Sequence, residues 1–415
     1  MSMKNMTTDV VIIGAGAAGM FAALTAARRG LRVLLLEKNE RNGKKLAITG
    51  KGRCNVTNAC SAEDVLKNIP CNSKFLFSAV YRFPPENAMA FFEENGCALK
   101  IERGNRVFPV SDRSADVIGA LERAMKKHQV QRRTAKVLGL FAQDGKISAV
   151  KTSEGIISAE RVILCTGGMS YPLTGSTGDG YDMAGALGHT IVAPTGSLVP
   201  LVADADCAKM QGLSLKNTLL RLVNAKGKTV FEDFGELLFT HFGLSGPTVL
   251  SASAHMKKNE RYTIELDLKP ALDEQKLDAR FLRDFEKYAN RSMENALADL
   301  YPTSMIPVML ARCGIDPQGK ANSLTKQERR LLLEQTKRFR IEVNGTRPVE
   351  EAIITRGGIS VKEVDPKTMQ SKLVEGLYFA GEILDCDAYT GGFNLQIAWS
   401  TAFCAANACA DSLHD

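Results

Sequence analysis

The sequence predicts an α/β protein with a Rossmann-like nucleotide-binding unit at its N-terminus. Three observations support this fold class. A complete βαβ pattern with Gly-x-Gly-x-x-Gly spacing covers residues 9–37, a strand-rich stretch interrupts the α/β pattern after residue 193, and an alanine-rich helix closes the chain. With 415 residues and ordinary apolar and charged fractions, the chain is long enough for two or three domains around a large core.

The first element is a buried strand ending at Gly14, followed by a helix of small residues and a second strand ending at Glu37. Gly14 allows the tight turn, Gly16 lets the backbone approach a pyrophosphate, and Gly19 lets helix and strand pack closely. The open amides and positive dipole of the helix N-terminus hold this anionic linker without a basic side chain. Glu37 accepts hydrogen bonds from an adenosine ribose and repels a 2′-phosphate, so FAD or NAD is expected and NADP is not.

The apolar run from Val10 to Ala27 has the length of a signal anchor or a membrane span. However, Asp9 stands where a cationic flank is expected, and Arg28-Arg29-Gly30 is typical of a helix C-terminus. No other run is long and apolar enough to span a bilayer. We therefore expect a soluble, cytoplasmic protein without a membrane partner.

The composition excludes several classes of site. Ten scattered cysteines without a secretory signal are expected to be mostly reduced, buried and inert, and no Cys-x-x-Cys pair supports a dithiol relay. The five histidines lack metal-ligand spacing, so no metal is expected. A net charge of +7 is modest for this length and favours a solvated surface, so we expect no nucleic-acid partner. The densest basic cluster, Lys38 to Arg53, is better explained by a bound dinucleotide.

The next elements lead back towards the nucleotide. A glycine-rich, basic loop covers residues 42–58, and residues 64–127 read as helices with short strands, including an amphipathic helix from about Ser114. Residues 133–159 predict a β-meander with turns at Asp144-Gly145 and Glu154-Gly155. A buried strand then ends at Gly167-Gly168, which can bring backbone close to a cofactor.

A helix is expected from Asp179 to Leu187, and the pattern then changes. Four strand-like segments predict a small β-barrel or sandwich, with a loop at residues 241–247; the segments are 216–223, 228–232, 236–240 and 261–268. Residues 271–336 turn helical, with helix starts marked by Asp273, Thr303 and Thr325. A strand returns at residues 339–343, and the last helix begins at Gly391-Gly392.

Three long motifs carry a family resemblance: residues 50–58, residues 235–247 and residues 381–395. Across nearly its whole length the chain resembles the FAD-dependent oxidoreductases of the BaiN-like or aminoacetone-oxidase-like family. The resemblance implies a Rossmann-like, glutathione-reductase-like FAD-binding domain built from both chain ends, with an inserted β-barrel and a small helical subdomain. The implied boundaries are 1–192 and 346–415 for the FAD domain, 193–270 and 337–345 for the barrel that would bind substrate, and 271–336 for the helical insert.

FAD is also favoured on physical grounds, because an extended cofactor needs contacts from distant segments and this chain supplies four glycine-rich ones. If the last helix starts at Gly391-Gly392, its amides can face flavin N1 and the C2 carbonyl, where negative charge develops on reduction. Many related flavoproteins have Gly-Asp where this chain has Gly381-Glu382. The expected cofactor-binding residues are Gly14, Ala15, Gly16, Ala18, Gly19, Glu37, Lys38, Lys45, Gly52, Arg53, Cys54, Asn55, Val137, Thr166, Gly167, Gly168, Asp179, Gly381, Glu382, Asp385, Gly392, Phe393, Asn394 and Leu395.

The catalytic groups are less clearly marked. Tyr171, His241 and Tyr389 are candidates, because each stands near glycine or proline in a loop. Cys54 is expected to be a small buried thiol beside the cofactor rather than its covalent or redox partner. No second complete Gly-x-Gly-x-x-Gly unit follows a strand, so NAD(P)H, if it is the donor, must visit the flavin as an exchangeable molecule.

The resemblance suggests an enzyme that acts on a small organic molecule. The leading hypothesis is NAD(P)H-dependent reduction of an activated C=C bond by hydride transfer through flavin N5. The alternatives are an FAD-dependent amine oxidase or dehydrogenase that uses O₂ and, from a different class, an RNA-associated flavoprotein. The sequence leaves the substrate and the oligomeric state open.

Overall fold

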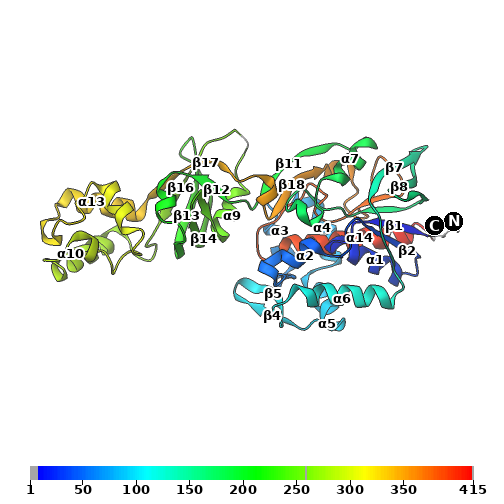
Figure 1. The fold of residues 1–415 in the computed structure, drawn as a ribbon, viewed down its shortest axis with the longest axis horizontal. Helices are drawn as coiled ribbons and strands as arrows, with labels where there is room; N and C mark the ends of the chain where they lie inside the picture. The colour runs from blue at the N-terminus through cyan, green and yellow to red at the C-terminus, as the bar shows by residue number, and fades with distance from the viewer. Residues whose placement is uncertain (1–7, 258, 414–415) are drawn as a thin grey trace. The chain divides into compact units, whose positions relative to one another are not determined.

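The computed structural model describes residues 8–257 and 259–413, which form two compact units. The first unit ends at Ser197 and resumes at Val349, so it is assembled from both ends of the chain. The second unit covers Leu198–Pro348. Figure 1 shows the elements of each unit.

A five-stranded parallel sheet forms the centre of the first unit, in the order β19-β10-β1-β2-β6. Its strands are short and, apart from β6, buried, as expected for apolar runs in a parallel sheet covered on both faces. Strand β19 comes from the C-terminal part of the chain, which confirms the predicted assembly. The bounds are β1 (Val10–Ile13), β2 (Val33–Glu37), β6 (Gln131–Thr134), β10 (Val162–Leu164) and β19 (Leu377–Phe379).

Two long helices, α1 (Ala17–Arg28) and α14 (Phe393–Asp411), pack side by side in this unit (Figure 1). The fully buried Trp399 on α14 lies 5.7 Å from the ring of Phe21 on α1, and its indole N–H donates to the carbonyl of Val56 at 2.9 Å. These contacts hold the C-terminal helix in the core of the first unit. The other helices are α2 (Lys44–Ile48), α3 (Ala62–Lys67), α4 (Phe77–Arg82), α5 (Pro85–Glu94), α6 (Ser114–Lys127) and α7 (Asp179–Ala186).

Three smaller sheets complete the first unit. They are β3-β5-β4 (Thr57–Asn58, Arg106–Pro109, Leu99–Glu102), the meander β7-β8-β9 (Val137–Gln143, Lys146–Thr152, Gly155–Ser158) and the pair β11-β18 (Ile191–Ser197, Ile354–Ile359). The meander confirms the prediction from its two turns. The predicted start at Arg133 is wrong, because Arg133 and Thr134 belong to β6 and pair with β2 in the parallel sheet.

The second unit contains a closed six-stranded barrel in the order β12-β15-β14-β13-β16-β17. Residues 228–232 and 236–240, predicted as two strands, form one long strand because the residues between them continue to pair with β13, Gly235 opposite Thr218. The predicted loop at 241–247 also contains structure, since β15 precedes helix α9 (Pro247–Ser253). The bounds are β12 (Leu201–Ala203), β13 (Ser214–Asn224), β14 (Thr229–Thr240), β15 (Gly243–Ser245), β16 (Tyr262–Asp267) and β17 (Phe339–Thr346).

The helical part of this unit shares a hydrophobic core with the barrel. Asp273 and Thr325 cap helices as predicted: Asp273 accepts from the amide of Lys276 at 2.7 Å, and Thr325 forms a capping box with Glu328. The predicted start at Thr303 is wrong, because that helix begins at Ile306 and places its proline in the first turn. The helices are α8 (Asp206–Lys209), α10 (Glu274–Lys287), α11 (Met293–Ala296), α12 (Ile306–Cys313) and α13 (Lys326–Lys337).

Within the part of the chain that the structure describes, no helix has both the length and the apolar character needed to cross a membrane.

Candidate cofactor site

A large pocket lies at the carboxyl ends of the parallel strands, entirely within the first unit. It encloses about 1270 Å³, counting the space open to solvent. Its wall includes the turn after β1, the end of β2, the loop after β10, the start of β18, and the segment after β19 that leads to α14. This is the edge of an α/β sheet where ligands bind.

The three glycines of the first turn have different surroundings. Gly14 has a φ of +96°, and a Cβ there would lie 2.6 Å from the carbonyl oxygen of Cys165. A Cβ on Gly19 would lie 1.7 Å from the carbonyl oxygen of Gly14, so only glycine lets the helix approach the strand. A Cβ on Gly16 would meet no described heavy atom within 4 Å beyond its own neighbours, and Gly16 lines the pocket. The space above Gly16 is therefore a cradle for a ligand.

Two helix N-termini face this pocket. Neither α1 nor α14 has a side-chain cap or an acidic residue in its first turn. Residues of both first turns, Ala17 and Ala18 of α1 and Asn394 and Leu395 of α14, line the pocket. Uncapped helix N-termini favour negative charge, which matches a pyrophosphate at one helix and the N1 side of a reduced flavin at the other. The donor set therefore fits FAD.

Glu37, the last residue of β2, is held in the pocket wall by hydrogen bonds to both of its carboxylate oxygens. One carboxylate oxygen accepts from the amide of Ala15 at 2.7 Å, and the other accepts from the amide and the side chain of Asn39, both at 2.8 Å. Glu37 is buried and lines the pocket. Each carboxylate oxygen can accept more than one hydrogen bond, so these contacts orient the carboxylate and leave capacity for ribose hydroxyls.

Lys38 follows Glu37 in the chain and contacts residues at the start of α7. Its ammonium group contacts Asp179 at 2.7 Å and the hydroxyl of Thr177 at 2.6 Å. Burial acts to raise the pKa of Asp179, but the hydrogen bonds from Lys38 and Thr177 outweigh it, so the pKa is lowered. Asp179 therefore stays ionised in the first turn of α7, where the helix dipole also favours a carboxylate.

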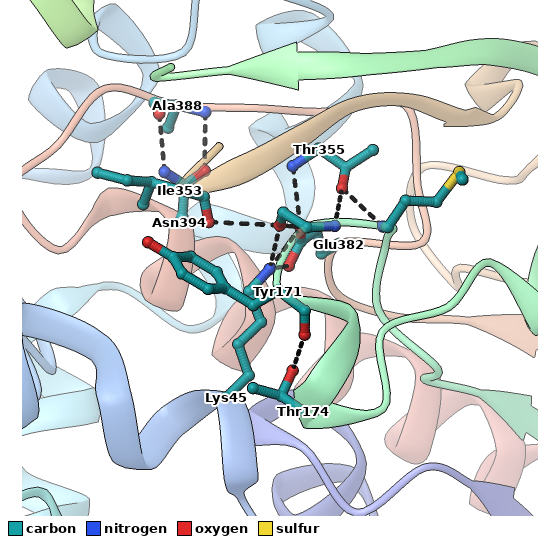
Figure 2. A network of polar contacts seen from close by, with 10 residues as sticks. Lys45, Tyr171, Thr174, Ile353, Thr355, Glu382, Ala388 and Asn394 are labelled. Atoms are coloured by element: carbon teal, nitrogen blue, oxygen red, sulfur yellow. Dashed lines mark hydrogen bonds and ion pairs between the residues drawn. The ribbon is translucent and has the colours of Figure 1, made fainter. Parts of the chain in front are cut away.

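A second ion pair joins Lys45 to Glu382, at 2.6 Å and 2.8 Å to the two carboxylate oxygens (Figure 2). The hydroxyl of Ser170 accepts from Lys45 at 2.6 Å, and the amide of Thr355 donates to Glu382 at 2.9 Å. The hydroxyl oxygen of Thr355 accepts from the amides of Met169 and Ser170 at 2.8 Å and 3.1 Å. These contacts tie four distant segments of the chain together at one side of the pocket.

Asn394 fixes the turn that enters α14. Its side-chain amide pairs with both backbone groups of Ala388, at 2.8 Å and 2.7 Å (Figure 2). The helix begins after Gly392, where φ is +101° and a Cβ would lie 2.3 Å from the backbone of Thr57. The predicted helix start is confirmed, and glycine is required there by this close approach.

Fifteen of the predicted cofactor-binding residues line the pocket: Gly14, Ala15, Gly16, Ala18, Glu37, Lys38, Lys45, Val137, Thr166, Gly167, Asp179, Gly381, Glu382, Asn394 and Leu395. The others are not part of its lining: Gly19, Gly52, Arg53, Cys54, Asn55, Gly168, Asp385, Gly392 and Phe393.

Several of these residues have structural partners instead. Arg53 forms ion pairs with Glu102 and Asp112, and its guanidinium lies 4.1 Å from the ring centroid of Phe108. Asp385 accepts from the side chain of Asn72 at 3.0 Å. Cys54 is fully buried, and burial raises the pKa of its thiol to about 12.

Ser170 and Thr355, the uncharged polar partners of the Lys45–Glu382 pair, were not predicted from the sequence. Some pocket residues that belong to recognised motifs were also not predicted. Thr49 belongs to the glycine-rich loop, and Arg41 and Lys44 belong to the basic cluster that was assigned to a dinucleotide, so a signal for these three was present. Ile353 and Ile354 line the pocket without any recognisable motif.

None of the three candidate catalytic residues belongs to the pocket lining. Tyr171 has a φ of +53° and immediately follows Ser170 of the ion-pair network. The backbone of Tyr389 is held by Asn68, which accepts from its amide at 3.0 Å, and by Asn394 at 3.4 Å. His241 is exposed and belongs to the second unit, where its ring packs edge-on against Phe242.

Comparison with known proteins identifies the family. The sequence matches the HI0933-like protein Rossmann domain over residues 8–408. The chain belongs to the HI0933-like family. This assignment confirms the resemblance to BaiN-like flavoproteins and, with the pocket, shows that this HI0933-like protein is an FAD-dependent oxidoreductase.

Two curated relatives cover almost the whole HI0933-like chain. A 3-dehydro-bile acid delta(4,6)-reductase of Clostridium scindens is 30% identical over 407 residues, covering 96% of this chain and 98% of the relative. A ribosomal RNA dihydrouridine synthase of Escherichia coli is 30% identical over 409 residues, covering 98% of each. The two relatives are therefore equally similar to this chain.

Solved structures support the fold of this HI0933-like protein. A flavocytochrome c3 fumarate reductase gives a TM-score of 0.53 at 17% identity, covering 98% of this chain and 79% of that one. The 3-ketosteroid delta1-dehydrogenase of Sterolibacterium denitrificans gives 0.51 at 15% identity, covering 99% and 100%. At these identities the likeness concerns the fold alone.

Proposed function

We propose that this protein reduces a C=C bond conjugated to a carbonyl group, using FAD and electrons from NAD(P)H. The observation that carries the proposal is that two full-length relatives, equally similar to this chain, are both named for saturating such a bond. A delta(4,6)-reductase acts on the double bonds of an oxidised bile acid, and dihydrouridine arises by saturating a ring C=C bond of uridine. The substrates differ, but the bond type is the same.

In this reaction a hydride adds to the carbon β to the carbonyl, and a proton adds to the α carbon. When bound, FAD supplies the hydride from N5 after taking it from NAD(P)H. The chain itself must hold the cofactor, orient the substrate and deliver the proton. Two uncapped helix N-termini and Glu37 provide for the first task.

Tyr389 is our candidate for the proton donor. Asn394 lines the pocket, and its side-chain amide donates to the backbone carbonyl of Tyr389 at 3.4 Å, so the Tyr389 backbone contacts a residue of the pocket wall. Replacing Tyr389 with Phe removes the hydroxyl and keeps the ring. We expect reduction of the flavin by NAD(P)H to be unchanged and reoxidation by an enone to slow by about 10²–10⁴-fold, the usual contribution of a general acid. Y81F, which removes the hydroxyl of an exposed tyrosine outside the pocket lining, is the matched control, and Y171F tests the other tyrosine candidate.

The test of the function begins with the purified protein under anaerobic conditions. NADH or NADPH should bleach the flavin absorbance without an organic substrate, and a conjugated enone should restore it in stoichiometric amounts. If neither nicotinamide reduces the flavin, the proposal fails, and amines tested with O₂ as acceptor become the leading alternative.

A uridine in RNA is the second candidate substrate, supported by the rRNA-directed relative. We rank a small molecule first, because the net charge of +7 is spread over 415 residues. Reoxidation of the reduced enzyme by a uridine-containing transcript, with binding that weakens steeply as salt increases, would reverse this order.

A further inference from the structure

The Lys45–Glu382 pair is more enclosed than other pairs near the pocket. The side chains of Lys45 and Glu382 are 19% and 13% exposed, and both residues line the pocket. The ammonium group has three N–H bonds, and it has three partners: the two oxygens of Glu382 and the hydroxyl of Ser170. Lys45 is therefore fully engaged by this site.

The two oxygens of Glu382 differ in their surroundings. Oε1 accepts from Lys45, from the hydroxyl of Ser170 at 3.1 Å and from the amide of Thr355 at 2.9 Å. Oε2 contacts Lys45 at 2.6 Å, and the described residues provide no further hydrogen-bond donor to it. Oε2 is thus the oxygen with capacity left for a ligand hydroxyl.

The position of this carboxylate creates an electrostatic problem. A flavin gains negative charge on reduction, and its nucleotide part carries two phosphates, so an uncompensated carboxylate in the same pocket opposes both binding and reduction. Lys45 lies directly against the carboxylate and cancels its charge. The neighbouring Lys44 also lines the pocket, but it is exposed and contacts the neutral side chain of Asn39 at 3.2 Å.

We infer that Lys45 is the counter-charge of Glu382, and that this pair sets the reduction potential of the bound flavin in addition to holding the cofactor. Glu382 keeps an oxygen available to the ligand, and Lys45 makes that oxygen tolerable in a pocket that must accept further negative charge. The inference concerns FAD and does not depend on the substrate.

The alternative is that the pair only braces the wall of the pocket. The two explanations predict different signs for the shifts of the flavin potential in the two single variants. If the pair is a brace, breaking it from either side loosens the site, and the two single variants change in the same direction. If it is a charge balance, K45M leaves a negative charge and lowers the flavin potential, whereas E382Q leaves a positive charge and raises it.

The experiment is a double-variant cycle on the full-length protein reconstituted with excess FAD. K45M, E382Q and K45M/E382Q are compared with wild type by the midpoint potential and by the dissociation constant for FAD. We expect opposite potential shifts for the single variants and a near wild-type potential for the double variant. The FAD dissociation constant should rise about 10- to 100-fold in K45M, because it strands a largely buried carboxylate, and recover in the double variant.

K44M is the matched control, because it removes a lysine charge next to Lys45 without stranding a carboxylate. Its effects on the midpoint potential and on the dissociation constant for FAD should be smaller than those of K45M. Combined with E382Q, K44M should add its own shift and should not restore the wild-type values. Unfolding of the FAD-free variants checks that each folds. If K45M does not fold, a raised potential in E382Q still tests the inference. Shifts of the same sign, no shift, or a double variant as impaired as K45M would overturn it, whatever the enzyme reduces.

Discussion

Gly16 and Gly19 stand one helical turn apart, yet the structure predicts opposite consequences for adding one methyl group to each. At Gly16 the φ is −80°, which alanine adopts freely, and the new Cβ would point into open space. Alanine gains about 0.4–1 kcal/mol by restricting the unfolded chain. It loses a similar amount as a poorer N-cap than glycine. The stability of FAD-free G16A should therefore stay within about 1 kcal/mol of wild type.

G19A should behave in the reverse way. Its Cβ would lie 1.7 Å from the carbonyl oxygen of Gly14, whereas real Cβ atoms essentially never approach closer than 3.0 Å. The contact is with backbone, so α1 must move away from β1 by more than an ångström. Overpacking of a well-packed core costs about 1–3 kcal/mol and occasionally more, and this site should lie at or above the upper end.

The binding of FAD separates the two variants again. The methyl group of G16A occupies the space where a pyrophosphate approaches the amides of α1. Loss of one or two charge-assisted hydrogen bonds of about 1.5–3 kcal/mol corresponds to roughly 100-fold weaker FAD binding. Denaturant unfolding of the FAD-free proteins and fluorescence titration with FAD measure both quantities. Wild-type affinity in G16A, or wild-type stability in G19A, would refute the assignment of these glycines.

Three further predictions concern individual side chains. T355V should destabilise the protein by about 2–4 kcal/mol in denaturant unfolding, because it leaves two backbone amides without an acceptor; T355S, which keeps the hydroxyl, should recover most of this loss. Cys54 should resist iodoacetamide at pH 8, because burial raises its pKa to about 12, and C54A should retain bound FAD; rapid alkylation in the folded protein would contradict the first expectation. The pKa of Asp179 is lowered in the folded state, so its contribution to the free energy of unfolding is fully present above the unfolded pKa of about 3.8 and is lost as the pH falls through the lower folded value. D179N should therefore destabilise the protein at pH 7, and the difference in stability from wild type should shrink below pH 3.8. A difference that stays constant with pH would contradict the role of Lys38.

The parts of the fold that follow from local steric requirements were predictable from the sequence. Gly14 and Gly19 have fixed positions in a βαβ unit, and the pattern shows them without knowledge of the rest of the chain. The same holds for Asp273 and Thr325, whose side chains cap the helix that immediately follows. Such signals act within a few residues of the element that they define.

Features set by distant partners were not predictable. Arg53 stands in a conspicuous basic motif, but it forms ion pairs with Glu102 and Asp112, which lie 49 and 59 residues later in the chain. Thr355 and Ser170 support the Lys45–Glu382 pair, although neither has a local pattern that marks it. The continuity of β14 likewise depends on its pairing with β13. The sequence pattern therefore located the pocket better than it located the supports around it.

The proposed function is tested by the anaerobic titration of the purified, FAD-loaded protein, followed through the visible absorbance of the flavin. We expect NADH or NADPH to bleach the flavin, and a conjugated enone added afterwards to restore the absorbance with one equivalent of saturated product formed. An oxidised flavin spectrum that persists through both nicotinamide titrations would show that this protein is not a reductase of activated C=C bonds that takes electrons from NAD(P)H.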